Sequence, residues 1–269
     1  MRAALKRLTP QPLWDAARKA YFGALYAREW PQVRFHPWRR ASVQRLAAFK
    51  DKHKGERAVI IGNGPSLRHT DLSRLKNEVT FGMNRIYLAF PEWGFQTSYF
   101  VSINDLVIEQ CAEDIRSLEM PKFLSWHSHP HFPLTEDTMF LHTTYYNPAF
   151  ARDVRRRVWE GATVTYVAMQ LAYYMGFEEV VLIGVDHSFK STGEPNTTVV
   201  SEGDDESHFD PSYFGEGFRW QLPDLETSEQ SYRLARQVYE SDGRRIVDAT
   251  IGGQLEVFPK VDFDEAFPV

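Results

Sequence analysis

The 269 residues, of which 43% are hydrophobic and 25% charged, exclude a wholly disordered chain and suffice for one large domain or one domain with an appendage. The single cysteine, Cys111, excludes an internal disulfide and a multi-cysteine zinc site. It favours a reducing compartment, and the sequence shows neither the apolar run of a secretory signal nor a membrane-length apolar stretch. We therefore expect a cytoplasmic protein.

Residues 1–54 differ in charge from the remainder of the chain. Thirteen Lys or Arg against three acids give them a formal charge of +10, whereas the other residues carry −15. Helical spacing governs residues 10–30 and 40–50, and we expect Pro31 and Pro37 to break the helix between them. Aromatic residues are interspersed among the cations. The segment is therefore expected either to pack on the main domain as a helical layer or to attach the protein to an anionic membrane surface, peripheral to its inner face.

Residues 55–269 are expected to form a single α/β domain. A short, wholly apolar run at 58–62 is typical of a strand that is buried on both faces of a parallel sheet. Similar runs occur at 79–83, 98–102, 122–126, 180–185 and 245–247, and helical spacing occurs between several of them, at 106–118, 164–175 and 226–239. This alternation predicts a doubly wound, mostly parallel, Rossmann-like sheet with residues 1–54 as an N-terminal helical extension.

A long segment without periodicity, residues 187–224, interrupts this pattern, and we call it the cover segment. It is rich in Gly, Ser, Thr, Asp, Glu and Pro. Loops of this length inside a compact domain are uncommon and often cover binding sites. We expect a flexible cover over an active site, with a disordered surface insertion as the alternative.

A glycine-containing loop follows the first expected strand directly and consists of Gly62, Asn63, Gly64, Pro65 and Ser66. In open α/β sheets, ligands bind at this carboxyl edge of the strands. The two glycines allow the backbone to approach a ligand closely, and the Asn and Ser side chains offer hydrogen bonds. The loop lacks the Lys of a P-loop and the third Gly of the dinucleotide fingerprint. We expect it to bind a nucleotide, and the alternative is a tight turn in which the glycines serve conformation only.

Polar side chains also follow the next two expected strands. Asn84 comes after the run 79–83, and Asn104 and Asp105 come after the run 98–102. Because the carboxyl ends of parallel strands meet at one edge of the sheet, these loops are expected to converge on the glycine loop. Each Asn could equally be a helix N-cap.

Two histidines are candidates for a general base. His208 lies in the cover segment, and an imidazole with an unperturbed pKa near 6.5 can accept a proton at neutral pH. His187 follows a strongly apolar strand and Asp186, which could orient its ring, hydrogen-bond a ribose or cap a turn. Tyr213 and the acids of residues 204–206 are the next candidates for the general base. A structural role is the alternative for each of them.

Taken together, these motifs resemble the bacterial CMP-sialic acid-dependent sialyltransferases and the wider MptE-like superfamily, over about residues 57–250. Besides the glycine loop, the resemblance rests on residues that recur in the same order, namely Asn84, Asn104, Thr163 at the start of a helix, Gly184 with Asp186, and His208. It implies a Rossmann-like fold in which the glycine loop and the Asn residues hold the cytidine nucleotide and His208 is the base. The nucleotide-binding candidates so implied also include Asp105, Thr163, Gly184 and Ser188.

The sequence departs from the sialyltransferases at the expected phosphate contacts. Thr163, Val164 and Thr165 stand where that family has Thr-Ser-Gly, and Ser188 stands where it has a tyrosine. The stretch at 248–259 is more similar to MptE-like proteins attached to bacterial glycan systems.

The resemblance implies a glycosyltransferase that moves an acidic sugar of the sialic acid or Kdo type from a CMP-activated donor to a glycan acceptor, without a metal or further cofactor. One alternative is the 6-hydroxymethylpterin diphosphokinase branch, which transfers pyrophosphate from ATP with Mg²⁺. Members of that branch have an Asp-x-Asp-Gly motif after a strand. Residues 102–105 of this chain stand at the comparable place and supply only one carboxylate, which weighs against Mg²⁺-dependent pyrophosphate transfer. A non-catalytic nucleotide-binding module is the third interpretation. We expect no nucleic-acid partner, because no such motif is present, and the sequence is compatible with a homo-oligomer.

Overall fold

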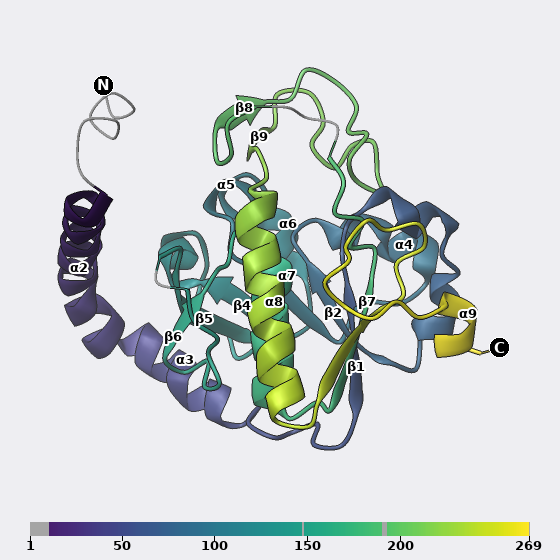
Figure 1. The fold of residues 1–269 in the computed structure, drawn as a ribbon, viewed down its shortest axis with the longest axis horizontal. Helices are drawn as coiled ribbons and strands as arrows, with labels where there is room; N and C mark the ends of the chain where they lie inside the picture. Colours follow the sequence, from purple (N-terminus) through teal and green to yellow (C-terminus); the bar gives the residue numbers. More distant parts are fainter. Residues whose placement is uncertain (1–10, 147, 190–192, 269) are drawn as a thin grey trace.

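The computed structural model describes residues 11–146, 148–189 and 193–268. They contain an eight-stranded sheet in the order β10-β7-β1-β2-β3-β4-β5-β6, in which every neighbouring pair is parallel (Figure 1). The strands are β1 (Arg57–Ile61), β2 (Val79–Met83), β3 (Tyr99–Ser102), β4 (Lys122–Ser125), β5 (Thr138–Thr144), β6 (Arg157–Trp159), β7 (Glu179–Ile183) and β10 (Arg245–Asp248). The expected doubly wound, Rossmann-like sheet is confirmed.

Two strands of this sheet, β5 and β6, were not predicted from the sequence. β5 is buried along its whole length although three of its seven residues are Thr and one is His. β6 has only three residues. Hydrophobic periodicity finds long apolar runs, so a buried strand rich in Thr and a three-residue strand give too weak a signal.

The strand order reverses around β1. From β1 the chain adds β2 to β6 on one side of the sheet, and β7 then returns to pair with the other side of β1. This is a topological switch point, where the loops after two adjacent strands diverge and leave a crevice at their carboxyl ends. The glycine loop follows β1 and the segment with Asp186 follows β7, so both lie at this crevice.

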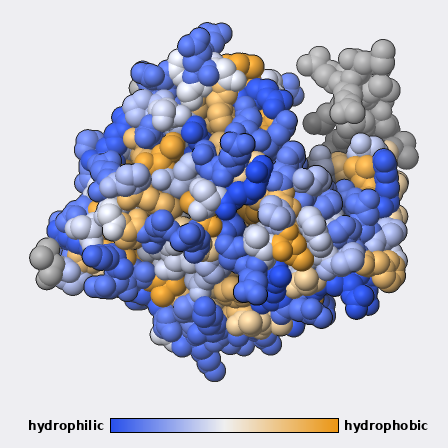
Figure 2. Space-filling view, turned by 180° about the vertical axis from the view of Figure 1, so that it is seen from behind, coloured by the Kyte–Doolittle hydropathy of each residue, from blue (hydrophilic) through white to orange (hydrophobic). Residues whose placement is uncertain are grey.

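Helices cover both faces of the sheet and form two apolar layers with it. On one face α7 (Val164–Met175) and α8 (Leu225–Ser241) pack with strand residues such as Ile60, Phe81 and Leu182. The other face packs against α5 (Asp105–Gln110), α6 (Ala112–Ser117), α9 (Phe263–Ala266) and a region around α4 (Phe90–Trp93). The single helix expected over 106–118 is two short ones that meet at Cys111. On the side of the molecule shown in Figure 2, hydrophobic residues are scattered among hydrophilic ones.

Four short 3₁₀ helices and a two-stranded hairpin complete the structure. The 3₁₀ helices are η1 (Pro65–His69), η2 (Leu72–Leu75), η3 (Ile86–Ala89) and η4 (Trp126–His131). The hairpin belongs to the cover segment and pairs β8 (Thr198–Val200) with β9 (Arg219–Gln221). Residues 190–192 of that segment lie outside the described residues.

The N-terminal part of the described chain is two helices that run along one side of the sheet (Figure 1). The first, α2 (Gln11–Phe35), continues through Pro31, so the expected break there is wrong. The break comes at His36, whose side chain accepts from the backbone of Trp38 and caps α3 (Pro37–Ala47) with Pro37 in its first turn. Proline suits a first turn because its missing N–H would have no intrahelical partner there. Residues 1–10 of the extension lie outside the described residues.

These two helices contact the domain unequally. The α3 side chains of Arg39, Ser42 and Leu46 are buried. The Ser42 hydroxyl donates to the carbonyl of Trp38 and accepts from the backbone N–H of Phe140 in β5. By contrast, α2 touches the domain near residue 146, through Phe22 and Tyr26. Three aromatic side chains of α2 stay exposed, with Tyr21, Trp30 and Phe35 at 58%, 56% and 60% of their full surface. In the described residues, no helix is both long and apolar enough to cross a bilayer.

The exposed aromatics and the basic charge of residues 1–54 make membrane attachment testable. We predict weak co-sedimentation with vesicles that contain anionic lipid, because each cation near such a surface contributes about 1 kcal/mol. Binding should weaken as salt rises, since the screening length falls from about 30 Å at 0.01 M to about 8 Å at 0.15 M. Charge reversal of the exposed Arg28, Arg34 and Arg40 should abolish it.

A matched control reverses three exposed cations of the domain, Lys76, Arg116 and Arg233. This triple variant should sediment like the wild type. If vesicle binding at low salt is absent, or if both triple variants lose it equally, residues 1–54 are not a membrane-attachment segment.

Candidate active site

A cavity of about 510 Å³ lies at the switch point, between the loops that follow the strands and the cover segment above them. Most of the residues predicted from the sequence line this cavity. They are Gly62, Asn63, Gly64, Asn84, Asn104, Asp105, Thr163, Gly184, Asp186, His187, Ser188, His208 and Tyr213. Pro65 and Ser66 are not among the described residues that line it, and they lie at the start of η1 behind the loop.

The glycine loop is interlocked with the segment that follows β7. The backbone N–H of Gly62 donates to Ile183 and that of Gly64 donates to Gly184. A Cβ atom on Gly62 would lie 2.2 Å from the carbonyl oxygen of Gly184, and one on Gly64 would lie 1.8 Å from Oδ2 of Asp186. Both glycines are therefore required by this close approach within the protein, whatever ligand the loop binds.

Asp186 holds the two loops together. Its Oδ1 accepts from the backbone N–H of Ser66 at 3.0 Å, and its Oδ2 accepts from the Ser66 hydroxyl at 2.7 Å. Burial raises the pKa of this carboxyl, and the hydrogen bonds from Ser66 act in the opposite direction. Of the possibilities that the sequence left open for Asp186, the structure shows a structural one, because both carboxylate oxygens are bonded to Ser66, whereas Nε2 of His187 lies close to Glu229.

Asn63 presents an amide oxygen that is buried and has no hydrogen-bond partner in the structure. Its backbone carbonyl accepts from Phe209 of the cover segment at 2.9 Å. A buried acceptor without a partner costs about 1–3 kcal/mol, so such atoms usually meet a ligand or water. Because Asn63 itself lines the cavity, a molecule bound there would lie next to this side chain.

The other two asparagines already use their amide oxygens within the protein. Asn84 has a positive φ of 53°, and its Oδ1 accepts from Ser102 at 3.0 Å. Asn104 caps α5 by accepting from the backbone of Leu106 and Val107 at 3.0 and 3.3 Å. Both therefore shape the cavity wall, and the N-cap that was the alternative for Asn104 is present.

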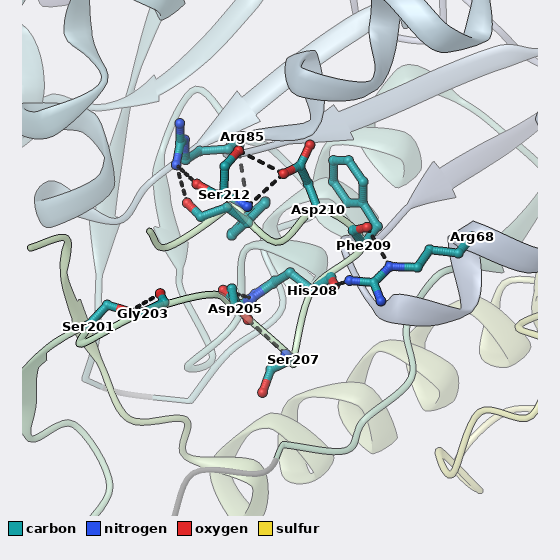
Figure 3. Close-up of polar contacts among 11 residues, drawn as sticks. Arg68, Arg85, Ser201, Gly203, Asp205, Ser207, His208, Phe209, Asp210 and Ser212 are labelled. Carbon is teal, nitrogen blue, oxygen red and sulfur yellow. Dashed lines mark hydrogen bonds and ion pairs between the residues drawn. The ribbon is translucent and has the colours of Figure 1, made fainter. Parts of the chain in front are cut away.

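The part of the cover segment that carries His208 is tied to the domain at several points (Figure 3). The guanidinium of Arg68 donates to the carbonyls of Phe209 at 2.7 Å and His208 at 2.9 Å. Arg85 donates to the carbonyls of Ser212, at 2.8 Å, and Tyr213. These two arginines follow β1 and β2, so the backbone around His208 is positioned by the same loops that form the cavity floor.

His208 is paired with a carboxylate. Its Nδ1 lies 2.7 Å from Oδ2 of Asp205, whose other oxygen accepts from the backbone of Ser207 at 2.7 Å. Desolvation raises the pKa of Asp205, but the hydrogen bonds from His208 and Ser207 outweigh it and hold that pKa below its ordinary value. An ionised Asp205 favours the tautomer with the proton on Nδ1, which leaves Nε2 of His208 as a proton acceptor. The ring stacks on Tyr213, with centroids 4.0 Å apart.

Two of the other base candidates, His187 and Tyr213, are less suited to accept a proton. Nε2 of His187 lies 3.3 Å from Oε1 of Glu229 in α8, so this nitrogen already has a partner. Tyr213 is 1% exposed, and burial raises the pKa of its hydroxyl far above neutrality. An un-ionised phenol is a poor base, and the position of Tyr213 under the His208 ring favours a packing role.

Two long helices begin at the cavity. Thr163 caps α7 by accepting from the backbone of Thr165, and Asp224 caps α8 by accepting from the backbone of Thr227. Thr163 and Asp224 both line the cavity. Helix N-termini carry unpaired N–H groups and partial positive charge, which favour phosphate groups nearby.

Sequence reasoning missed Glu160, which follows β6 and lines the cavity. Desolvation raises the pKa of its carboxyl to about 7, and the negative charge of Asp105 contributes in the same direction. The sequence offered no signal because β6 itself was not recognised. A hydrogen-bond network around Tyr145 was also missed. The Tyr145 hydroxyl donates to Asp224, the N-cap of α8, at 3.1 Å and accepts from Asn196 of the cover segment at 2.9 Å. The network links the cover segment to the start of α8.

The chain is similar to known proteins in sequence and in fold. A family model described as "6-hydroxymethylpterin diphosphokinase MptE-like" matches residues 38–192. A solved structure of the MAf glycosyltransferase from Magnetospirillum magneticum AMB-1 is similar in fold, with a TM-score of 0.51 and 14% sequence identity. The match covers 84% of this chain but 38% of that protein, so the chain spans well under half of its length. No curated protein matches the sequence.

Proposed function

The chain belongs to the 6-hydroxymethylpterin diphosphokinase MptE-like family, and on that premise we propose that it is a glycosyltransferase that uses a CMP-activated acidic sugar of the sialic acid or Kdo type as donor and a glycan as acceptor. The pairing of Asp205 with His208 at the rim of the switch-point cavity carries this proposal. Such a pair supplies the base that an acceptor hydroxyl needs.

In the proposed reaction, one set of residues binds the nucleotide and another activates the acceptor hydroxyl. The glycine loop and the N-terminus of α7 receive the nucleotide phosphate, and the amide oxygen of Asn63 accepts a hydrogen bond from the nucleotide. Departure of the nucleotide leaves positive charge on the sugar carbon, and Nε2 of His208 takes the proton of the attacking hydroxyl. Ionised Asp205 stabilises the resulting imidazolium.

A second candidate function is pyrophosphate transfer from ATP with Mg²⁺, which the name of the family model favours. The structure adds one observation in its support, because Glu160 brings a second carboxylate into the cavity with Asp105. Mg²⁺ is usually bound by one or two carboxylates together with substrate phosphates. Within the described ranges no group of three or more His, Cys, Asp or Glu is arranged to hold a metal ion.

A donor assay tests the proposal directly. The protein is incubated with CMP-sialic acid or CMP-Kdo, in the presence of EDTA, and CMP release is measured with and without a glycan acceptor. Acceptor-stimulated CMP release supports the proposed transfer. ATP-dependent, Mg²⁺-requiring diphosphorylation of a pterin alcohol, without CMP release from either donor, would replace it by the second candidate.

Asn63→Ala should weaken nucleotide binding by about 2–13-fold, because one neutral hydrogen bond is worth about 0.5–1.5 kcal/mol. Since the Asn63 amide oxygen has no partner among the described residues, the thermal midpoint should stay unchanged. Ser66→Ala is the contrasting variant, because it removes a donor to Asp186 and should lower stability. If Asn63→Ala binds CMP and ATP as the wild type does, the Asn63 amide does not contact the nucleotide.

A further inference from the structure

The cavity has an unusual balance of charged side chains for a phosphate-binding site. Among the described residues that line it, the acids are Asp105, Glu160, Asp186 and Asp224, and there is no Lys or Arg. Its two histidines are each paired with an acid outside this set, since His187 contacts Glu229 and His208 contacts Asp205. A nucleotide bound there therefore brings negative charge close to these four carboxyl groups.

Two of the four acids already accept hydrogen bonds within the protein. Asp186 accepts two hydrogen bonds from Ser66, and Asp224 accepts from Thr227 and Tyr145. Asp105 is more exposed than Glu160, although partial burial raises the pKa of its carboxyl too. Glu160 differs from Asp105 because it is half-buried in the cavity wall, where Thr143 of β5 lowers the pKa of its carboxyl.

The groups that face Glu160 come from three neighbouring elements. Besides Thr143, they are Asp105 at the start of α5 and His127 in η4. Desolvation and Asp105 raise the pKa of the Glu160 carboxyl, whereas Thr143 and His127 lower it, and the balance lies at about 7. The Glu160 carboxyl therefore exchanges its proton near neutral pH.

We propose that Glu160 determines the charge of the ligand that the cavity accepts, so that a phosphate-bearing ligand binds the form in which Glu160 carries a proton. Binding above neutral pH then takes up a proton from solution onto those Glu160 side chains that are ionised. The neutral carboxyl no longer repels the phosphate, and its O–H becomes a hydrogen-bond donor. The inference rests on the proposed function only in requiring a ligand that carries phosphate.

Calorimetric titration with CMP and with ATP at pH 6, 7 and 8 tests this inference. If the protonated form alone binds, the apparent Kd of the wild type rises about tenfold between pH 6 and pH 8, as the fraction of protonated Glu160 falls. Glu160→Gln keeps a neutral amide in place of the carboxyl and should lose that change. Ionisation of the nucleotide's own phosphate, with a pKa near 6, is common to both proteins, so their difference isolates Glu160.

Proton uptake provides an independent measurement on the wild-type protein. Titrations at pH 7.5 in two buffers of different ionisation enthalpy should show uptake of more than half a proton per nucleotide bound. His208→Ala and His187→Ala should retain that uptake, whereas Glu160→Gln should not. Uptake that persists in Glu160→Gln and disappears in either histidine variant overturns the inference.

The outcomes also separate this inference from the proposed function. If ATP binds with the expected pH dependence and CMP does not bind, Glu160 acts as inferred and the CMP-donor proposal fails. If CMP binds with equal pH dependence in the wild type and Glu160→Gln, the inference fails and the donor proposal stands. Absence of saturable binding of both nucleotides at pH 6, where binding should be tightest, contradicts both.

Discussion

His208→Ala is expected to lower kcat for sugar transfer by about 10²–10⁴-fold while it leaves the affinity for CMP nearly unchanged. The reason is that, in the proposed reaction, Nε2 of His208 would take the acceptor's proton only in the transition state, whereas the loops after β1 and β7 would hold the nucleotide. Folding should survive, because the backbone around His208 is held by Arg68 and Arg85 through carbonyl groups that the substitution keeps. The measurement is kcat and CMP affinity on the same preparation.

Two further variants decide whether the base is correctly assigned. Asp205→Asn keeps the size of the side chain but cannot hold the same His208 tautomer, so it should also lower kcat by orders of magnitude. His187→Ala should cost much less, since its Nε2 is engaged with Glu229. A large loss in His187→Ala together with near-normal turnover in His208→Ala would reverse the assignment, and small effects in both would end histidine base catalysis.

Gly62→Ala is expected to lower stability by about 1–3 kcal/mol or more and to abolish measurable nucleotide binding. Its new Cβ would lie 2.2 Å from the carbonyl oxygen of Gly184, and this backbone atom cannot move aside by a side-chain rotation. The strand ends β1 and β7 would have to separate, and the cavity lies between their loops. Chemical denaturation and CMP titration measure the two effects.

Gly203→Ala is the matched control for this substitution. A Cβ on Gly203 would meet no atom within 4 Å, so stability should change by less than about 0.5 kcal/mol. If Gly62→Ala proves as stable as Gly203→Ala and binds nucleotide normally, the two loops do not interlock as described.

The elements that position the site were predictable where buried apolar strands end in polar loops. The runs at 58–62 and 180–185 correspond to β1 and β7, and their loops meet at the cavity as expected from parallel pairing. The pair Asp205 and His208 also had a local signal, because the two residues are three positions apart in the cover segment. The sequence interpretation weighed them separately, as alternative bases, and so missed that one orients the other.

Other features depend on contacts between distant parts of the chain. The role of Asp186 is set by Ser66, 120 residues earlier, and no local pattern shows that both its oxygens are used there. Glu160 acquires its raised pKa from burial and from the negative charge of Asp105, which lies at the start of α5 after another strand. Pairings of this kind follow from the fold and not from spacing, so they appear only once the sheet order is known.

The proposed use of a CMP-activated donor is tested most directly by nucleotide binding. The shift of the thermal unfolding midpoint is measured with CMP, CDP, ATP and GTP, each with Mg²⁺ and with EDTA. A transferase that uses a CMP-activated donor should show a shift with CMP that is the same in EDTA and in Mg²⁺, and that is smaller in Asn63→Ala. A shift with ATP that requires Mg²⁺, with none for CMP under either condition, would contradict it.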